Sequence, residues 1–96
     1  MIFEWDEDKN RQNIAKHGLS FESATGIFDG FTLNSIDNRF EYGEIREISI
    51  GMIETVAVVS VVHTDRNGRC RIISARPAVR SERLRYEKAL RKAFNP

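Results

Sequence analysis

The pattern of apolar and polar positions predicts two helices near the start of the chain. Across Asp6–His17, acidic residues stand first and basic residues last, as the helix dipole favours. Gly18 follows at a position where helices commonly end, and Ser20 is a suitable N-cap for a second helix. The apolar stripe of that second helix, closed by an Asp-Gly pair, consists of Phe21, Ala24, Ile27 and Phe28.

From residue 31 the pattern changes to a period of two, which indicates strands. Residues 46–52 alternate most clearly, whereas residues 55–64 are apolar on both faces, as in a central strand. Asp65–Arg69 contains Asn-Gly, a strong signal for a hairpin turn. The expected strands are 31–37, 46–52, 55–64 and 70–75, and residues 2–5 form a short strand or a lead-in.

A last helix is expected over residues 80–94. Its apolar positions recur at helical spacing, so that side should pack on the sheet; they are Tyr86, Ala89, Leu90 and Ala93. The order of elements predicts an α+β fold with two N-terminal helices, a mostly antiparallel sheet of about four strands, and a C-terminal helix. We expect one domain over residues 1–96.

Charge is distributed unevenly along the chain. The net charge of +1 over 96 residues argues against a generic nucleic-acid binder. However, residues 1–45 carry a net charge of −5 and residues 46–96 carry +6, and nine of the eleven basic residues in the second half are arginine. Guanidinium groups bind phosphates and carboxylates through a planar fork of donors. The asymmetry therefore fits an anionic ligand, and it fits internal pairing between the two halves equally well.

Two further features suggest a cytoplasmic protein. The sequence has no long apolar run for a membrane span and no apolar leader for secretion. Cys70, the single cysteine, lies within an expected strand and is predicted to be a small buried hydrophobe in a reducing compartment.

The first helix carries an unusual face. Asn10, Asn13, Ile14 and His17 form one stripe, in which only Ile14 is apolar, and Lys16 lies beside it. Either Lys16 and His17 merely complement the helix dipole and nearby carbonyls, or they act on a ligand. The residue types alone favour the first reading.

The strand arginines need a particular geometry to form one site. Arg71 and Arg76 are separated by an odd number of residues, so a regular strand would send them to opposite faces. They can serve one site only if a bulge or the bend before proline redirects Arg76. Arg46 begins a neighbouring strand and is the better candidate to converge with one of them.

On the last helix, Glu82 and Tyr86 are expected to face the sheet. Glu82 could hold Arg76 in place, and the Tyr86 hydroxyl could reach the same cavity. The alternating charges of Arg83, Glu87 and Arg91 indicate a solvated face instead.

Metal or cofactor chemistry is not expected. His17 and His63 are 46 positions apart, and no paired cysteine or histidine motif is present. No nucleophile elbow or glycine-rich loop supports a serine triad.

Three ordered blocks make the sequence resemble the BrnT family of type II toxin–antitoxin toxins. The first block extends from Phe3 to Ala24 and includes Trp5-Asp6 and Lys16-His17-Gly18-Leu19. The second is Tyr42-Gly43-Glu44-x-Arg46, followed by Gly51. The third contains Thr64-x-Arg66, Arg71-Ile72-Ile73-Ser74-Ala75-Arg76-x-Ala78 and Glu82-Arg83-x-x-Tyr86. Relatives more often carry an aromatic residue such as tyrosine where this chain has His63, and the tail after Leu90 lies outside the resemblance.

This resemblance implies a RelE-like fold and a ribonuclease that halts translation. It also implies a cognate antitoxin, in a symmetric heterotetramer that binds operator DNA through the antitoxin. We therefore expect a metal-independent endoribonuclease acting on RNA, with no membrane partner. The candidate site residues are Lys16, His17, Arg46, Arg66, Arg76, Glu82 and Tyr86.

Within this hypothesis, His17 is the first candidate for proton transfer, and Lys16 supplies charge or acts as an acid. The three arginines would bind phosphate, and Glu82 and Tyr86 would orient them. Two alternatives stay open. The chain could be a non-enzymatic toxin that poisons a protein target such as a topoisomerase, or a structural module whose arginines pair only with its acidic half.

Overall fold

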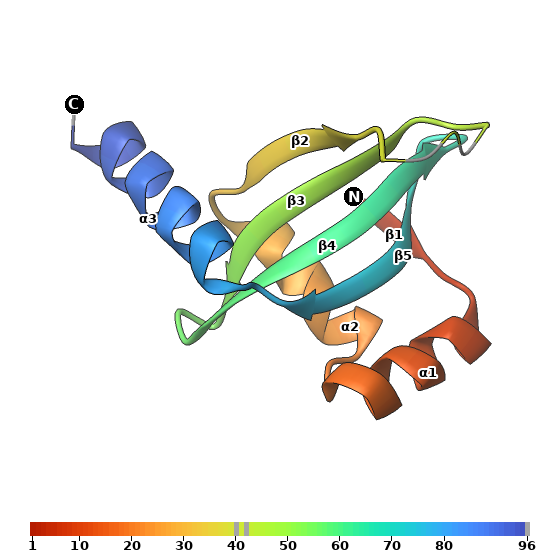
Figure 1. Cartoon of the computed structure of the whole chain (residues 1–96). Helices are drawn as coiled ribbons and strands as arrows, with labels where there is room; N and C mark the ends of the chain where they lie inside the picture. The colour runs from red at the N-terminus through yellow and green to blue at the C-terminus, as the bar shows by residue number, and fades with distance from the viewer. Residues whose placement is uncertain (40, 42, 96) are drawn as a thin grey trace.

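Five strands form one sheet, in the spatial order β1-β5-β4-β3-β2, in the computed structural model, which describes residues 1–39, 41 and 43–95 (Figure 1). Tyr42 of the second sequence block lies outside the described residues. The strands are β1 (Ile2–Glu4), β2 (Leu33–Asp37), β3 (Arg46–Ile53), β4 (Ala57–Arg66) and β5 (Arg69–Pro77). The helical segments are α1 (Glu7–His17), α2 (Phe21–Ala24), the 3-10 helix η1 (Thr25–Asp29) and α3 (Arg80–Phe94).

The sheet has one strand more than the sequence pattern predicted, and it is mixed. Strands β2 to β5 are antiparallel to one another, as expected, whereas β1 pairs in parallel with the start of β5. The two paired segments are Ile2–Glu4 and Arg69–Arg71. Three residues are too few to show a period of two, so the sequence alone left this segment as a strand or a lead-in.

Helix α1 ends at His17 as predicted and begins one residue later than expected, with Asp6 as its N-cap. The Asp6 carboxylate accepts hydrogen bonds from the backbone N–H groups of Asp8 and Lys9, at 2.9 and 3.3 Å. At the other end Gly18 adopts a left-handed φ of 68° and donates its N–H to the Ile14 carbonyl. Both ends therefore satisfy backbone groups that a helix would otherwise leave unpaired.

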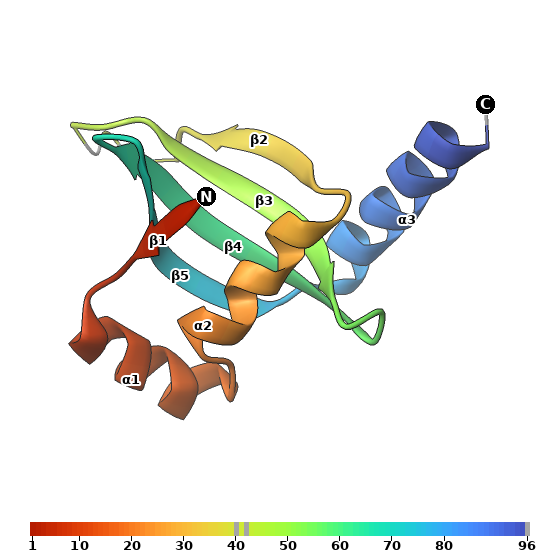
Figure 2. The ribbon, with the colours of Figure 1, turned by 180° about the vertical axis from the view of Figure 1, so that it is seen from behind.

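Segments α2 and η1 cover the back of the sheet (Figure 2). The expected second helix is thus a single α-turn followed by a 3-10 helix. The packing is close at Gly51, where an added Cβ would come within 2.6 Å of the Ile27 Cβ. This sheet face and its helical cover form the core, which consists of Phe21, Ala24, Ile27, Val59, Val61, Ile72 and Ala75.

The hairpin between β4 and β5 turns at Asn67-Gly68, as predicted. Both residues have positive φ, at 54° and 81°, which is what a two-residue turn of the mirror-image type requires. Arg66 and Arg69 pair across it.

Helix α3 departs from the sequence prediction after its first two turns. Glu82 and Tyr86 are buried, but Leu90 is only half-buried and Ala93 is exposed. The helix leaves the sheet and extends beyond it (Figure 1). The expectation that its whole apolar side packs on the sheet is therefore wrong. No described helix combines the length and apolar content that crossing a membrane requires.

Candidate functional site

A β-bulge brings the strand arginines onto one face of the sheet. Ser74 pairs with Val62 and Ile72 with His63, so Ile73 is an extra residue on β5. Consequently Arg71 lies opposite Thr64 and Arg76 lies opposite Ser60. Since those two partners are four residues apart on β4, Arg71 and Arg76 share a face, about 13 Å apart. The sequence had made their convergence conditional on such a bulge.

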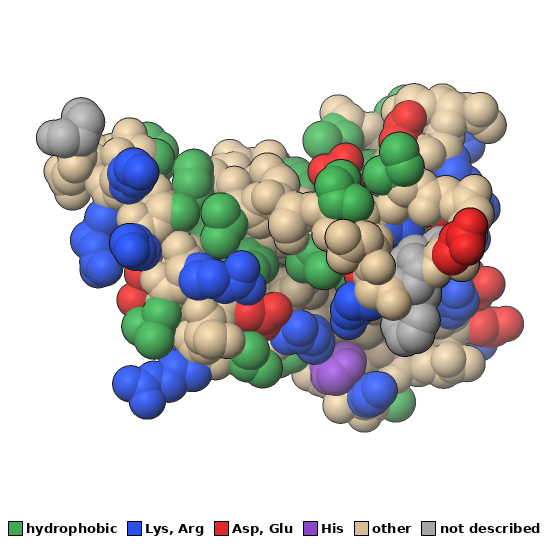
Figure 3. Space-filling model, turned by 45° about the horizontal axis from the view of Figure 1, so that its top comes forward, with side chains coloured by type: hydrophobic (Ala, Val, Ile, Leu, Met, Phe, Trp, Pro, Cys, Tyr) green, Lys and Arg blue, Asp and Glu red, His purple; other side chains and the backbone are tan. Residues whose placement is uncertain are grey.

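Two more of the predicted arginines lie on the same face. Arg66 is two residues beyond Thr64 on β4, and alternation places both on one side. Glu47 of β3 pairs with His63 of β4. The preceding residue, Arg46, therefore lies level with Thr64 and on the same face. This face, which we call the open face, is opposite to the one covered by α2 and η1. Lys and Arg side chains spread across it in Figure 3, from α3 to the far end of the sheet, with a histidine at its margin.

Carboxylates of the chain hold the arginines at one end of the open face. Glu44 accepts from Arg46 Nε at 3.1 Å and from an Arg66 terminal nitrogen at 3.3 Å. The hydrogen bond from Arg46 is the main reason why the pKa of Glu44 lies below its usual value. Glu4 similarly accepts from Arg71 at 2.8 Å. These groups are half-buried or exposed, so each pair adds little to stability, typically about 0–1 kcal/mol.

At the other end of the face, Arg76 and Glu82 form the predicted pair. The contact is bidentate, with N···O distances of 2.8 and 3.0 Å. Glu82 also accepts from the Val79 N–H at 2.9 Å, so it caps α3 as well. The hydrogen bond from Arg76 is the main cause of the lowered pKa of Glu82. Because only 8% of Glu82 is exposed whereas the Arg76 side chain is 40% exposed, Arg76 can still meet a ligand.

The remaining predicted residues lie around this face in two separate places. Lys16 and His17 line a groove of about 250 Å³ between α1 and β5, together with Ile73 and Ser74. Ser74 lies between Arg71 and Arg76 on the open face, so the groove meets that face there. Tyr86, by contrast, donates its hydroxyl to the Phe31 carbonyl at 3.0 Å and lines a different hollow.

Sequence reasoning missed the role of the asparagines of α1. Asn13 donates to the carbonyls of Ala75 and Leu19, at 2.7 and 2.8 Å, and accepts from the Ala75 N–H at 3.3 Å. It thereby satisfies both backbone groups of Ala75 on β5. Asn10 accepts from the N–H of Phe21 at 2.8 Å. The available signal was two asparagines on the docking stripe of a helix, a position where this residue is disfavoured unless its amide is used.

The covered face holds a separate polar cluster, made of Asn34, Ser49 and His63. The Ser49 hydroxyl lies 2.7 Å from His63 Nε2 and 2.6 Å from Asn34 Oδ1. The Phe28 ring packs edge-on against the imidazole, with ring centroids 5.1 Å apart. Burial lowers the pKa of His63, although Glu47 opposes the effect. His63 is therefore neutral near pH 7 and belongs to the fold rather than to the open face.

Cys70 lies near this cluster and is half-buried, where the sequence predicted a buried thiol. Burial, with smaller contributions from Glu47 and Asp65, raises the pKa of its thiol to about 11. The thiolate is the reactive form of cysteine, so this side chain is chemically inert at neutral pH. Within the described part of the chain, no three His, Cys, Asp or Glu side chains are grouped to hold a metal ion.

Comparison with known proteins bears on these features. A family model described as the ribonuclease toxin BrnT of type II toxin–antitoxin systems matches residues 5–82. No curated protein matches the chain significantly. Among solved structures, the fold is similar to the crystal structure of the Brucella abortus ribonuclease toxin BrnT, with a TM-score of 0.62 and 24% sequence identity. That alignment covers 83% of this chain and 100% of the other.

Proposed function

Because the chain belongs to the BrnT family of ribonuclease toxins, we propose that it is a metal-independent endoribonuclease that cleaves RNA and thereby inhibits translation. One observation supports this most strongly. Arginines from three strands share the open face, and the groove containing Lys16 and His17 meets that face at Ser74. An RNA strand lying across the face would have cations along its backbone and an imidazole at one side.

The proposed reaction needs proton transfer and a cluster of positive charge. The ribose 2′-oxygen loses its proton and attacks the adjacent phosphorus, and the bond from phosphorus to the 5′-oxygen breaks. The products are a 2′,3′-cyclic phosphate and a 5′-hydroxyl group. Histidine is the side chain best suited to exchange protons near neutral pH. We assign that role to His17, and Lys16 supplies charge or protonates the leaving oxygen.

The arginines would stabilise the doubly charged phosphorane of the transition state. Arg46, Arg66 and Arg76 are the residues we propose for this work, and the bulge adds Arg71 to them. Glu82 would orient Arg76 through its bidentate contact. Tyr86 would act indirectly, since its hydrogen bond to Phe31 fixes α3 beside the sheet.

Incubation of the purified protein with total RNA in the presence of EDTA tests this proposal. We expect fragments with 5′-hydroxyl ends, formed at the same rate with and without the chelator. His17→Ala should be inactive, and Arg11→Ala is the matched control because Arg11 is an exposed residue of the same helix, paired with Asp8. RNA that stays intact with stoichiometric, folded protein would refute the proposal.

A non-enzymatic toxin that binds a protein target, such as a topoisomerase, is the second candidate. The observation in its favour is that Arg46, Arg71 and Arg76 all contact carboxylates, so the open face is equally suited to an acidic protein surface. This candidate predicts growth arrest without RNA cleavage, and the same arginine variants would abolish it.

Membership of a type II toxin family implies a cognate antitoxin. We propose that the two proteins form a symmetric heterotetramer that binds operator DNA through the antitoxin. Co-expression followed by light scattering tests the assembly. A mass equal to two copies of each chain is expected, and any other stable stoichiometry would contradict the proposal.

A further inference from the structure

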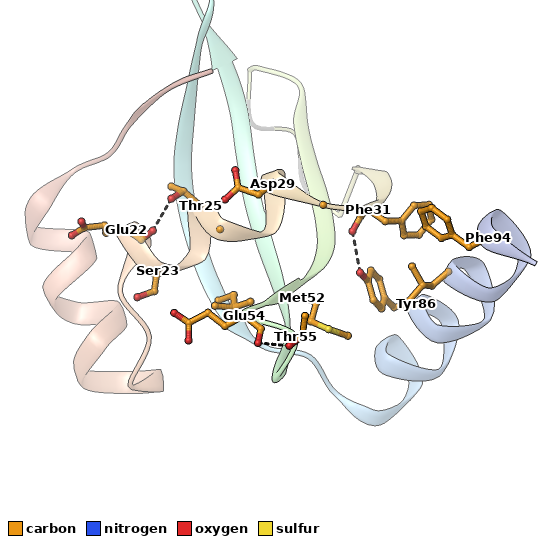
Figure 4. Close-up of a pocket in the computed structure, with 14 residues that line it drawn as sticks. Glu22, Ser23, Thr25, Asp29, Phe31, Met52, Glu54, Thr55, Tyr86 and Phe94 are labelled. Carbon is orange, nitrogen blue, oxygen red and sulfur yellow. Dashed lines mark hydrogen bonds between the residues drawn. The ribbon is translucent and has the colours of Figure 1, made fainter.

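An apolar groove of about 700 Å³ opens between α3 and η1, at the end of the sheet where β3 turns into β4. Phe31 lines it and contacts the rings of Tyr86 and Phe94, with centroids 5.9 and 6.1 Å apart. Figure 4 shows Phe31, Tyr86 and Phe94 together on one side of the groove, with Met52 below them. Glu22, Asp29 and Glu54 lie on the other side.

The wall formed by α3 is largely exposed over its last turns. Tyr86, Leu90 and Phe94 recur at intervals of four residues and form a stripe along the helix. Tyr86 is buried, but 69% of Phe94 is exposed. Short helices are marginally stable without tertiary packing, and contiguous exposed apolar surface commonly marks a binding site. The groove is therefore suited to receive another apolar segment.

The charges beside the groove indicate what that segment contains. Helix α3 carries six basic residues and two acidic ones, and one of the two, Glu82, is held by Arg76. At 100° per residue, basic residues flank the apolar stripe on both sides; they are Arg91 on one side, next to Glu87, and Arg85 and Lys92 on the other. A second copy of α3 lying alongside would bring like charges together, which disfavours self-association.

We infer that this groove binds an amphipathic helix of the antitoxin, with its apolar stripe against Tyr86, Leu90 and Phe94 and acidic residues facing α3. This inference rests on the proposed function, because it takes the partner to be an antitoxin. The occupant packs as a helix in a groove, anchored by residues at intervals of three and four. Its basic or neutral edge faces Glu22, Asp29 and Glu54.

The wall of the groove that α3 forms lies beyond the family match. The match ends at Glu82, so Tyr86, Leu90 and Phe94 lie beyond it. The groove also begins one helical turn after Glu82, the residue that holds Arg76. A helix bound there selects the partner and lies within reach of the open face.

The test uses the neighbouring gene product whose co-expression rescues growth. Its affinity for the toxin is measured by calorimetry for wild type and for two variants. Phe94→Glu, at an exposed position, should weaken binding at least about tenfold, because it removes an aromatic anchor and adds a charge that faces acidic groups. The double variant Arg91→Glu/Lys92→Glu should weaken binding more at low salt than at high salt, because salt screens exposed charges. Arg11→Glu on α1 is the charge-matched control and should bind as wild type does.

Each outcome decides the inference. Loss of binding by both variants, with unchanged melting curves and unchanged RNA cleavage, supports it. Wild-type affinity in either folded variant overturns it. If the toxin alone forms dimers, and Phe94→Glu is monomeric but still binds the antitoxin, the inference is overturned. The groove is then occupied by a second copy of this chain. The absence of any rescuing neighbour also overturns it. If binding follows the expected pattern but wild type cleaves no RNA, the ribonuclease proposal fails and the groove assignment stands.

Discussion

The two faces of the sheet use polar residues in different ways. Ser49 on the covered face and Asn13, which bonds the backbone of β5 from α1, are less than 9% exposed, and their hydrogen bonds are made to other parts of the chain. On the open face, the side chains of four arginines are 23–50% exposed in their pairs with Glu44, Glu4 and Glu82; they are Arg46, Arg66, Arg71 and Arg76. A buried polar group is costly to leave unpaired, whereas a half-exposed ion pair exchanges partners at little cost.

This difference separates residues that hold the fold from residues that are accessible to a ligand. Changes on the covered face should lower the free energy of unfolding and change the cleavage rate little per folded molecule. Changes around the open face should lower the cleavage rate and change the free energy of unfolding little. The exception is Arg76, whose partner Glu82 is buried and caps α3.

The largest expected effect is on activity, from His17→Ala. Removing a general acid or base lowers rates by about 10²–10⁴-fold, so we expect cleavage to fall at least about 100-fold. The free energy of unfolding should change by less than about 0.5 kcal/mol, as is usual for surface substitutions. The rate of RNA cleavage and the unfolding free energy from chemical denaturation, both measured on the same preparation, check these two expectations. Full activity in the variant would remove His17 from the site.

Arg76→Ala should reduce both activity and stability. The loss of one guanidinium beside the transferred phosphate is expected to cost about 10²-fold in rate, and the unpaired Glu82 should cost about 1–2 kcal/mol of stability. The double variant Arg76→Ala/Glu82→Gln separates the two effects, because glutamine is uncharged. Stability should recover while cleavage stays low. If cleavage recovers together with stability, Arg76 has only a structural role.

Asn13→Ala should be the most destabilising of these changes, because it removes the contact between α1 and the backbone of β5. It leaves the N–H and C=O of Ala75 and the carbonyl of Leu19 without their partner, at about 2–4 kcal/mol in total if each costs about 1 kcal/mol. Urea denaturation measures the loss. Gln12→Ala, an exposed position on the same helix, is the control. An equal loss in both variants would mean that the asparagine bridge contributes nothing specific.

The smallest expected effect is the pH dependence contributed by His63. Its pKa in the folded chain lies below the ordinary value of 6.5 because of burial. As pH falls below 6.5 the unfolded chain binds the proton first, so stability decreases towards the folded pKa. His63→Gln should flatten the change in unfolding free energy between pH 7 and pH 5. The ion pairs of Glu82 and Glu44 change the pH dependence of stability only at lower pH, because the pKa of each carboxyl group is lowered from 4.5. If the unfolding free energy of His63→Gln changes between pH 7 and pH 5 as much as that of wild type, the assignment of this pH dependence to His63 is wrong.

Much of the fold could be predicted from local signals. The end of α1 at Gly18, the Asn67-Gly68 turn and the start of α3 depend on neighbouring residues only, and all agree with the sequence prediction. The parallel pairing of β1 could not be predicted, because its partner lies almost seventy residues away. The path of α3 was mispredicted because its apolar stripe does not show whether the sheet or another protein covers it.

The candidate site was predictable only in part for a similar reason. The Arg76–Glu82 pair follows from helical geometry and was foreseen. The common face of Arg71 and Arg76 depends on the extra residue Ile73, which no local pattern indicates. The role of Asn13 depends on the position of Ala75, on a distant strand. Contacts between residues far apart in the sequence therefore decide which polar residues are structural and which are accessible to a ligand.

The central claim is that RNA binds the open face beside the α1 groove. The most direct test is an NMR titration with an RNA oligonucleotide that carries a 2′-deoxy substitution, which binds but cannot be cleaved. We expect shifts in the side-chain signals of Arg46, Arg71 and Arg76 and in the imidazole of His17, and none at His63. Shifts confined to the polar cluster of Asn34, Ser49 and His63 or to the groove beside Phe94, or no shifts at all, would contradict this proposal.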